Sequence, residues 1–371
     1  MMHAFERFGL LINDRIVRTP VGIASMAGIV DASYVLDRAA HIGFAFIGGY
    51  SIDGPTMTAA KTIAAGGDRK EFLYEDPVAE LKAQIALMEK SDVVFGINLR
   101  GSSPDSFGSL AKTIGDTVVY EIDAHCRQPA MVAAGCGEYY LKNPDRLVAV
   151  VRALKEEGVT VSVKIRIGVA GDDRALAVAL WKAGADILHI DLMDAGSAKL
   201  RQIRNSCPLL IIANNSITNF DRMREMLSHG ADMVSLARQS DERTLAGLDA
   251  AITRYADEEG WYNAPKQICR GGDIRGLAFC CMPVKECPLI PTLSRIGMPR
   301  EDYIRLKLDS VRGTPLEHGS QTCFGSLAFC CKNSSPCMFR NMTLKQHNIS
   351  PKEYMRLKRD LSETIMNRIF P

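Results

Sequence analysis

The first 240 or so residues repeat one pattern, in which short apolar runs alternate with amphipathic stretches, and this pattern constrains the fold most. Stretches such as DPVAELKAQIALMEK and NPDRLVAVVRALKEEG separate most of the runs. Short apolar runs closed by turn residues are typical of buried parallel strands, so eight alternations predict an α/β fold, a (β/α)8 TIM barrel. A doubly wound sheet is the alternative, but no G-x-G-x-x-G follows the first run. The eight runs lie at residues 20–25, 43–47, 93–99, 117–123, 159–165, 187–191, 209–213 and 233–236.

Two segments outside these runs carry further expectations. The segment FGLLINDRIVRTPVGIASMAG reads as a small hairpin that leads into the first buried strand. Residues 50–76 are long for a connection between a strand and the next helix, and such connections tend to be lids or mobile segments. We therefore expect residues 50–76 to lie over the mouth of the barrel.

Length and charge set the domain count and exclude some partners. A chain of 371 residues is too long for one core, and we expect a barrel over residues 1–255 and a second domain over residues 262–371. The net charge of +2 gives no electrostatic argument for a nucleic acid, a membrane or an acidic partner. No apolar run approaches the roughly 20 residues of a membrane span, and the start of the chain lacks a basic-then-apolar signal pattern. We therefore expect a cytoplasmic protein without membrane contact.

Cys126 lies directly after one of the predicted strands, between His125 and Arg127. The carboxyl ends of barrel strands are where such folds place their chemistry, and either neighbouring cation would favour the thiolate. A small apolar cysteine that closes a strand is the structural alternative, and Cys136 is interpreted in that way.

The last 110 residues contain two related units, each with L-A-F-C-C-x5-C, a proline and a helix carrying Y-x-R-L-K. Small repeats of this size bury little apolar surface, so a metal or a cluster must contribute to their stability. In a reducing compartment, clustered cysteines indicate metal or Fe–S ligation. We predict a mainly helical domain of two tandem metal-binding repeats, whose ligands are Cys269, Cys280, Cys281, Cys287, Cys323, Cys330, Cys331 and Cys337.

The spacing of the thiols bears on which group they hold. Four thiolates in each repeat satisfy either a tetrahedral zinc or a [4Fe–4S] cluster. Adjacent pairs such as Cys280-Cys281 suit two irons of a cluster better than one small tetrahedral ion. We therefore favour two [4Fe–4S] clusters, with zinc as the alternative and disulfides as a third reading. The spacing is not that of ferredoxins.

Several motifs of the predicted barrel resemble those of the flavin-dependent tRNA-dihydrouridine synthases, in the same order and at similar spacing. ASMAGIVD at residues 24–31 resembles that family's A-P-M-A-G-V-T-D, and EIDAHCRQP resembles its I-N-x-G-C-P. FGINLRGSSPD, VKIRIG, ILHID, IIANNSI and GADMVSLAR continue the likeness, which spans about residues 15–240. The Cys-rich unit resembles the domain named methanogenesis marker domain 9, which implies a methanogenic source.

The first resemblance implies an FMN barrel and a role for particular residues. Cys126 matches the family's catalytic cysteine, a general acid that protonates substrate carbon during hydride transfer. Lys164 matches the lysine at the flavin N1/O2 side and is counted as catalytic as well. A cation there suits the anionic reduced ring, and loops after the seventh and eighth strands are the usual phosphate site of a barrel. The implied cofactor contacts are Ser25, Met26 and Ala27 along the ring, Asn98 at the pyrimidine edge, Lys164, His189, and for the phosphate Asn214, Asn215, Ser216, Ala237 and Arg238.

Three departures from the family pattern bear on function. The glycine-rich phosphate motif is replaced by A-N-N-S-I, and the Arg-rich loop expected after His189 is missing. The helical domain that grips tRNA is replaced by the Cys-rich repeats, and a net charge of +2 does not compensate for lost RNA contacts. FMN binding is therefore the firmer expectation and tRNA modification the weaker one.

Three functions follow as hypotheses. The first is an FMN-dependent oxidoreductase that reduces a C=C or similar bond of a small-molecule or nucleotide substrate, with Fe–S clusters relaying electrons from a donor protein. The second is a tRNA-dihydrouridine synthase with a metal-built RNA-binding module. Its support comes from Arg127, Lys164, Arg166 and the Y-x-R-L-K helices. The third is a non-enzymatic metal-binding interaction protein. We favour the first, in a methanogen-linked process.

Overall fold

The computed structural model describes residues 4–67, 69–193, 195–283, 286–333 and 336–370. Two compact units make up the chain, one of residues 1–226 with 231–251 and one of residues 227–230 with 252–371. Each is described by itself. Among the described residues, no helix is both long enough and apolar enough to cross a membrane.

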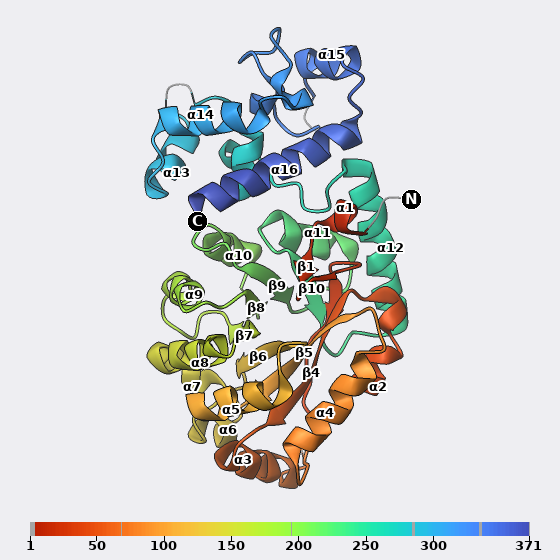
Figure 1. The fold of residues 1–371 in the computed structure, drawn as a ribbon, viewed down its shortest axis with the longest axis vertical. Helices are drawn as coiled ribbons and strands as arrows, with labels where there is room; N and C mark the ends of the chain where they lie inside the picture. Colours follow the sequence, from red (N-terminus) through yellow and green to blue (C-terminus); the bar gives the residue numbers. More distant parts are fainter. Residues whose placement is uncertain (1–3, 68, 194, 284–285, 334–335, 371) are drawn as a thin grey trace. The chain divides into compact units, whose positions relative to one another are not determined.

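The first unit is a closed barrel of eight parallel strands in the order β10-β3-β4-β5-β6-β7-β8-β9 (Figure 1). Each strand falls on one of the eight apolar runs, which confirms the predicted TIM barrel. Almost every residue of these strands is buried, as expected when helices cover the outside and side chains fill the inside. The strands are β3 (Val21–Ile23), β4 (Phe44–Ser51), β5 (Val94–Arg100), β6 (Val119–Ala124), β7 (Thr160–Arg166), β8 (Ile187–Asp191), β9 (Leu210–Asn214) and β10 (Met233–Leu236).

Helices lie around the outside of the barrel, and sequence signals mark where several of them begin. Asp76, Ser103 and Asp172 each accept a hydrogen bond from a backbone N–H of the first turn that follows, so each is an N-cap. Proline stands in the first turn of several others, where its missing N–H costs nothing. The helices are α2 (Ala32–Leu36), α3 (Gly54–Ala65), α4 (Pro77–Met88), α5 (Pro104–Ile114), α6 (Pro129–Ala133), α7 (Glu138–Lys142), α8 (Pro144–Glu156), α9 (Asp173–Lys182), α10 (Ser197–Arg204), α11 (Phe220–Ser228) and α12 (Glu242–Glu259), which continues into the second unit.

The N-terminal segment forms the predicted hairpin after a short helix, α1 (Ala4–Phe8). Strands β1 (Leu11–Ile12) and β2 (Arg15–Ile16) pair antiparallel. The two residues between them, Asn13 and Asp14, both have positive φ, the backbone conformation that a tight two-residue hairpin turn requires.

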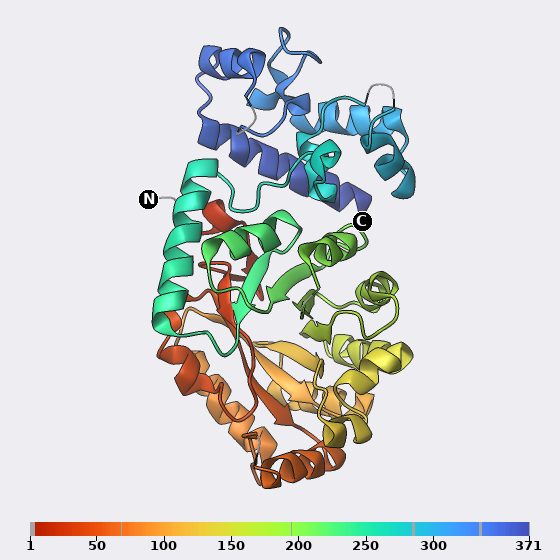
Figure 2. The same cartoon turned by 180° about the vertical axis from the view of Figure 1, so that it is seen from behind.

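Helices and short 3-10 turns make up the second unit, which Figure 2 shows from the opposite side to Figure 1. Its two repeats have the same layout, since each L-A-F-C-C segment is a 3-10 turn that ends at the first cysteine of the pair. The elements are η2 (Ile268–Arg270), η3 (Ile274–Phe279), α13 (Leu289–Arg295), α14 (Arg300–Val311), η4 (Pro315–Glu317), η5 (Leu327–Phe329), α15 (Met338–Gln346) and α16 (Pro351–Ile369). The predicted helical, repeated character of this region is therefore present.

Candidate active site at the barrel mouth

Strand β6 delivers Cys126 to the carboxyl end of the barrel. All six residues of β6 are buried, and the chain turns immediately after Ala124. Asp123 fixes this turn, because its Oδ1 accepts hydrogen bonds from the backbone N–H groups of His125 (3.1 Å) and Cys126 (3.0 Å). The position of the sulfur is thus set by a side chain at the end of the strand itself.

A chain of alternating charges surrounds Asp123. Its Oδ2 accepts from Arg100 Nε at 2.9 Å, and its Oδ1 lies 2.7 Å from His125 Nδ1. Arg100 Nη1 in turn donates to Glu71 Oε2 at 2.6 Å. Burial alone would raise the pKa of Asp123, but His125 and Arg100 hold that pKa well below its ordinary value. Asp123 is therefore an ionised carboxylate that orients both the imidazole and the Cys126 turn.

The Cys126 thiol itself is almost fully buried. Burial, reinforced by the charge of Asp123, raises its pKa, and Arg100 only partly opposes the rise. The expectation that the flanking cations favour a thiolate is therefore wrong, since Asp123 engages the His125 ring and Arg127 points into solvent. A thiol that stays protonated at neutral pH is suited to donate a proton rather than to attack as a nucleophile.

Arg166, at the end of β7, holds the same loop from the other side. Its guanidinium donates to the His125 carbonyl (3.3 and 3.4 Å) and pairs with Glu138 (3.0 Å) and Asp191 (3.7 Å). Two carboxylates thus already balance its charge. This makes Arg166 a residue that supports the Cys126 loop.

Lys164 brings a buried cation to the mouth. Its Nζ lies 3.1 Å from Ser25 Oγ and 3.4 Å from the Ser25 carbonyl oxygen, and the residue is 2% exposed. Among the residues that the structure describes, no carboxylate lies within ion-pair distance of Nζ. A buried ammonium without a carboxylate partner is costly unless an anion comes to it.

Below this cation, Glu121 joins three strands inside the barrel. Its carboxylate accepts from Asn98 Nδ2 (2.8 Å), Ser162 Oγ (3.2 Å) and His189 Nδ1 (2.6 Å). Burial would raise the pKa of Glu121, but His189 and these hydrogen bonds lower it, so the group is ionised. The arrangement directs the Asn98 amide group and fixes the tautomer of His189, with its proton on Nδ1.

His189 has both ring nitrogens engaged by the protein. Nε2 accepts a hydrogen bond from the Ser235 hydroxyl at 2.7 Å, and Ser235 Oγ in turn accepts from Asn214 Nδ2 at 2.8 Å. Burial lowers the pKa of His189, although Glu121 opposes the fall, so the ring is neutral. The ring is fully buried, and any contact with a cofactor there has to use carbon atoms of the ring or the neighbouring backbone.

The loops after β9 and β10 contain the five residues expected near a phosphate. Asn215 and Ser216 have φ of 109° and 53°, the left-handed backbone that glycines favour. Asn215 Nδ2 donates to the Met193 carbonyl at 2.8 Å, which holds the turn in place. The A-N-N-S-I departure therefore keeps a glycine-like backbone, because asparagine tolerates this region best among the other residues. Ala237 is half-buried and Arg238 exposed after β10.

The loop after β3 presents Ser25, Met26 and Ala27 at the same end of the barrel. Ser25 is buried beside Lys164, whereas Met26 and Ala27 are half-buried. Gly28 follows with φ of 69° and lies so close to the Lys70 backbone that a Cβ would clash at 2.5 Å. The segment around residue 70 thus passes directly over this loop.

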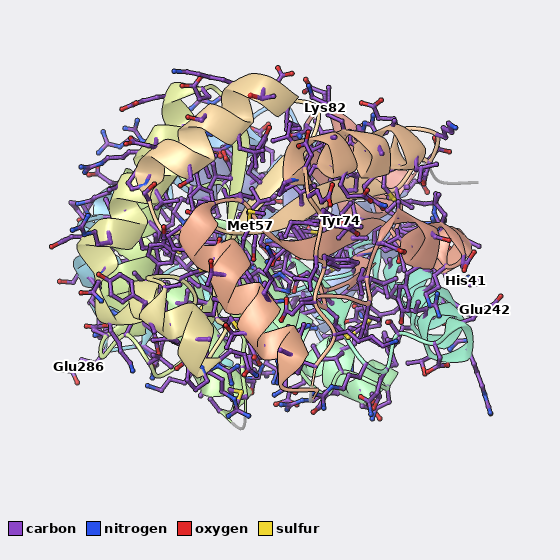
Figure 3. The ribbon with its side chains drawn as sticks, turned by 90° about the horizontal axis from the view of Figure 1, so that it is seen from below. His41, Met57, Tyr74, Lys82, Glu242 and Glu286 are labelled. Carbon is purple, nitrogen blue, oxygen red and sulfur yellow. The ribbon has the colours of Figure 1, made fainter. Side chains whose placement is uncertain are left out.

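Residues 50–76 contain a helix, α3, that we did not predict, followed by an extended stretch. The stretch folds over the mouth, since Glu71 pairs with Arg100 at the end of β5. Phe72 stacks on Tyr50 of β4 at a ring-centroid distance of 4.9 Å, and Tyr74 lies tilted to the Tyr50 ring at 6.1 Å. Met57 of α3 and Tyr74 of the stretch that follows, both labelled in Figure 3, line a small pocket. Its other lining residues include Tyr50, Ser51, Lys61, Phe72 and Pro77. Residues 69–76 therefore lie where we predicted a lid.

In the second unit, the Y-x-R-L-K motifs act inside the repeats. Tyr303 donates to the carbonyls of Leu277 (2.9 Å) and Cys280 (3.4 Å), and Tyr354 donates to those of Cys330 (3.1 Å) and Cys331 (2.8 Å). Both tyrosines are completely buried. Each motif therefore fastens its own Cys-Cys turn, so the tyrosines are not available to hold RNA.

The lysines of the two motifs are also buried, and they bind backbone carbonyls. Lys307 Nζ donates to Leu277, Ala278 and Cys280 at 3.0, 3.4 and 2.7 Å. Lys358 Nζ donates to Ala278 at 2.9 Å and to Ala328 at 2.6 Å, one carbonyl in each repeat. No carboxylate pairs with either lysine among the described residues, and burial lowers the pKa of both side chains.

Seven of the eight predicted metal ligands gather in two neighbourhoods, and the eighth, Cys323, is exposed. Burial raises the pKa of Cys280 to about 11, with Cys269 and Cys281 adding to the rise. Burial likewise raises the pKa of Cys330, to which Cys337 and Cys331 contribute. The thiols of each set are thus close enough to interact.

The thiols do not converge as ligands do. Within the described part of the chain, no three His, Cys, Asp or Glu side chains form a group that could hold a metal ion. Residues 284–285 and 334–335, inside the two C-x5-C spacers, lie outside the described residues. An all-thiol donor set suits Fe–S or zinc chemistry, and the centres remain a prediction.

Comparisons with known proteins agree with this geometry. Residues 70–244 match the family model described as dihydrouridine synthase (Dus). A crystal structure of DHODH from Eimeria tenella, in complex with ferulenol, has a TM-score of 0.52 at 13% identity, over 71% of this chain and 88% of that one. This second likeness shows the fold.

Two curated relatives come from Methanocaldococcus jannaschii. Uncharacterized protein MJ0144 is 28% identical over 231 residues, 59% of this chain and 88% of that protein. Uncharacterized protein MJ0115 is 52% identical over 107 residues, 29% of this chain and 69% of that protein. The chain therefore belongs to the same family as MJ0115, and the similarity of residues 70–244 to the dihydrouridine synthase model supports a flavin-dependent oxidoreductase.

Proposed function

We propose that the protein is an FMN-dependent oxidoreductase that reduces a C=C or similar bond of a small-molecule or nucleotide substrate by hydride transfer. The observation that carries this proposal is Lys164, a buried ammonium at the barrel mouth whose hydrogen bonds go to Ser25 alone. An anionic reduced flavin is the partner that such a cation suits. Both curated relatives come from Methanocaldococcus jannaschii, which supports a methanogen-linked process.

The charged and hydrogen-bonding groups at the mouth suit the groups of an FMN molecule. Lys164 would face the N1/O2 side of the ring, and Asn98 would offer its amide oxygen, because Glu121 takes its NH2 group. The left-handed backbone at Asn215 and Ser216 leaves room for a phosphate against main-chain N–H groups. The full proposed set is Ser25, Met26, Ala27, Asn98, Lys164, His189, Asn214, Asn215, Ser216, Ala237 and Arg238.

Cys126 would serve as the proton donor. When bound, FMN supplies the hydride to one atom of the double bond, and the Cys126 Sγ–H proton goes to the other. Asp123 holds the Cys126 backbone, and burial keeps the thiol protonated at neutral pH because it raises its pKa. The 69–76 stretch would exclude water from the mouth.

We further propose that the eight cysteines hold two [4Fe–4S] clusters, which would supply electrons one at a time. Burial lowers the pKa of Lys307 to about 7 and that of Lys358 well below its ordinary value, and the neighbouring cysteines oppose this fall. Thiolate charge on bound centres would therefore keep both lysines protonated, which supports anionic centres. Zinc is the alternative. Reduced thiols and clusters of this kind fit a cytoplasmic location.

The test is an anaerobic purification, followed by an absorbance spectrum and assays of flavin, iron, sulfide and zinc on one sample. We expect about one FMN and about eight irons per chain, as two four-iron clusters require. Substitutions Cys281→Ser and Cys331→Ser should each remove half the iron, and Cys136→Ser none. Zinc without iron would overturn the relay. Absence of flavin in every preparation would overturn the proposed reaction.

A second function, tRNA-dihydrouridine synthesis, is favoured by the match of residues 70–244 to the dihydrouridine synthase model. Four side chains of the Y-x-R-L-K motifs that this function would use to contact RNA are buried, namely Tyr303, Lys307, Tyr354 and Lys358. Mass spectrometry of tRNA nucleosides before and after incubation with the reduced protein decides between the two. Conversion of uridine to dihydrouridine that depends on Cys126 would establish tRNA as the substrate.

A further inference from the structure

Side chains hold the 69–76 stretch to the mouth of the barrel. Residues 69–75 form no helix or strand, and within the described part of the chain no backbone–backbone hydrogen bond involves them. Phe72 and Tyr74 contact the ring of Tyr50, and Glu71 forms an ion pair with Arg100. Segments with so few backbone hydrogen bonds open at a low cost in free energy. The stretch can therefore lift while the rest of the barrel stays folded.

The ion pair between Glu71 and Arg100 is closed off from solvent. Glu71 Oε2 lies 2.6 Å from Arg100 Nη1, and the two side chains are 2% and 6% exposed. Arg100 Nε donates at 2.9 Å to Asp123, whose other carboxylate oxygen accepts from the Cys126 backbone N–H at 3.0 Å. A continuous chain of hydrogen bonds thus runs from the 69–76 stretch to the turn that carries the thiol.

The charges of this chain act on the thiol in opposite directions. Burial raises the pKa of Cys126 most, Asp123 and Glu71 add to the rise, and Arg100 opposes it. If the stretch lifts, Glu71 leaves, the sulfur meets water, and Arg100 keeps only one carboxylate partner. All three changes favour the thiolate, so an open stretch tolerates a charged sulfur better than a closed one does.

The other charged or titratable groups around Cys126 belong to the barrel rather than to the stretch. Apart from Arg100 and Asp123, they are His125, Arg127, Cys136, Glu138, Lys164 and Arg166. Their charges are present whether the stretch is open or closed. Glu71 is the group whose charge comes and goes with the stretch.

We propose that Glu71 is a positioning residue that couples closure of the 69–76 stretch to the proton on Cys126. The proposal rests on the proposed function, because it concerns Cys126 as the proton donor. While the stretch is closed, the Glu71–Arg100–Asp123 chain keeps the thiol protonated. In the reaction the S–H bond breaks, the proton goes to substrate carbon, and the electron pair stays on sulfur.

The thiolate left behind competes with Glu71 for the positive charge of Arg100. Coupling of this kind is reciprocal, so a group that favours the thiol when it closes is released when the thiolate forms. The stretch then opens, and the sulfur regains its proton from water. Proton donation is thereby linked to opening of the mouth.

The first test measures how fast iodoacetamide alkylates Cys126 in the full-length protein from about pH 7 to about pH 11. The tryptic peptide of residues 113–127 contains Cys126 as its only cysteine, so mass spectrometry follows this thiol alone. The midpoint of the rate profile reports the pKa of the thiol, whereas the limiting rate at high pH reports its accessibility. We expect Glu71→Gln to lower the midpoint by roughly 0.5 to 1 pH unit, which raises the rate below the midpoint roughly threefold to tenfold.

The matched control is Glu75→Gln, the same chemical change at an exposed carboxylate of the same stretch. It should leave the midpoint at the wild-type value, and circular dichroism checks that both variants are folded. An unchanged midpoint in Glu71→Gln would overturn the proposal, even with a higher limiting rate, because the stretch would then only cover the thiol. An equal shift in Glu75→Gln would overturn it too, since any charge on the stretch would then suffice.

A second test runs the coupling in the other direction. Cys126→Asp places a negative charge where the thiolate forms, and Cys126→Asn has nearly the same shape without the charge. Arg69 and Lys70 are exposed beside Glu71, so trypsin can cut the stretch once it lifts. At about pH 8.5 we expect cleavage after Lys70 to be at least roughly threefold faster in Cys126→Asp than in Cys126→Asn. Equal rates would contradict the coupling.

The proposal and the proposed function fail in different ways, because neither test needs flavin or substrate. If the midpoint falls as expected but no preparation contains flavin, the coupling stands and the proposed reaction fails. If reduction of a substrate depends on Cys126 but Glu71→Gln leaves the midpoint unchanged, the reaction stands and the coupling fails.

Discussion

Replacing Glu121 with glutamine tests the polar core beneath the mouth. The carboxylate accepts three hydrogen bonds, from Asn98 and, at its other oxygen, from Ser162 and His189. Glutamine has only one acceptor oxygen. If that oxygen serves His189 and Ser162, the glutamine NH2 group faces the NH2 group of Asn98.

The expected cost follows from these contacts. One charge-assisted hydrogen bond is lost, two buried donors are set against each other, and the bond from His189 loses its ionic partner. Together these effects should destabilise the barrel by roughly 3 kcal/mol at pH 7. Ser162→Ala removes only the 3.2 Å contact and should cost about 1 kcal/mol.

The dependence of this stability difference on pH gives a second readout. The folded-state pKa of Glu121 is lowered, so its contribution is present above the unfolded value of about 4.3. It is lost as the pH falls further, through the folded-state pKa. The difference between wild type and Glu121→Gln should therefore be full at pH 7 and shrink below about pH 4.3.

The assay is urea unfolding followed by tryptophan fluorescence. The chain has two tryptophans, Trp181 in α9 and Trp261 in the second unit. In a Trp261→Phe background, Trp181 reports on the barrel alone, which separates its transition from that of the second unit. A loss below about 1 kcal/mol, or one equal to that of Ser162→Ala, would refute the reasoning.

Three further predictions concern the mouth. Cys126→Ala should lower kcat by roughly 10²- to 10⁴-fold while FMN is retained. Because the pKa of the Cys126 thiol is raised, the wild-type rate should fall only above the ordinary thiol pKa of about 8.5. A decline of the wild-type rate at neutral pH would contradict this. Lys164→Met should lower the midpoint potential of bound flavin in a redox titration, with Lys199→Met as a surface control. Asp123→Asn should cost roughly 3 kcal/mol at pH 7; since its pKa is lowered, that difference should fade as the pH drops below about 3.9 in an acid-unfolding series.

The barrel was predictable because its signal is local. Each strand is a short apolar run closed by turn residues, which is the pattern of a strand buried on both faces. Helix α3 was missed although Asp53 and Pro55 mark its start, because only Thr56, Ala59 and Ala60 face the core and no apolar stripe results. Small side chains at these three positions let α3 pack without large apolar residues.

The charges around Cys126 were not predictable, because they come from separate parts of the chain. Arg100 ends β5, Asp123 ends β6, and Glu71 reaches them from the stretch after α3. The rule that polar residues at strand ends meet at the mouth singles out Arg100 and Asp123. Nothing local signals that Glu71 joins them, or that Asp123 takes the imidazole of His125 away from the thiol.

The Y-x-R-L-K motifs misled for a related reason. A tyrosine and a lysine on a polar helix look like surface residues, since lysine is almost never fully buried. In the repeats, short 3-10 turns leave backbone carbonyls without partners, and Tyr303 and Lys307 supply the donors. The repetition of the motif beside each Cys pair was the signal, and it indicated structure rather than RNA binding.

The bond from Lys358 to the Ala278 carbonyl makes the duplication unequal. The hydrogen-bond partners described for Lys307 all lie in its own repeat, whereas the first repeat takes one of its donors from the second. During synthesis the first repeat leaves the ribosome some 80 residues before that donor does. The first repeat therefore completes its hydrogen bonding only after the second has been synthesised.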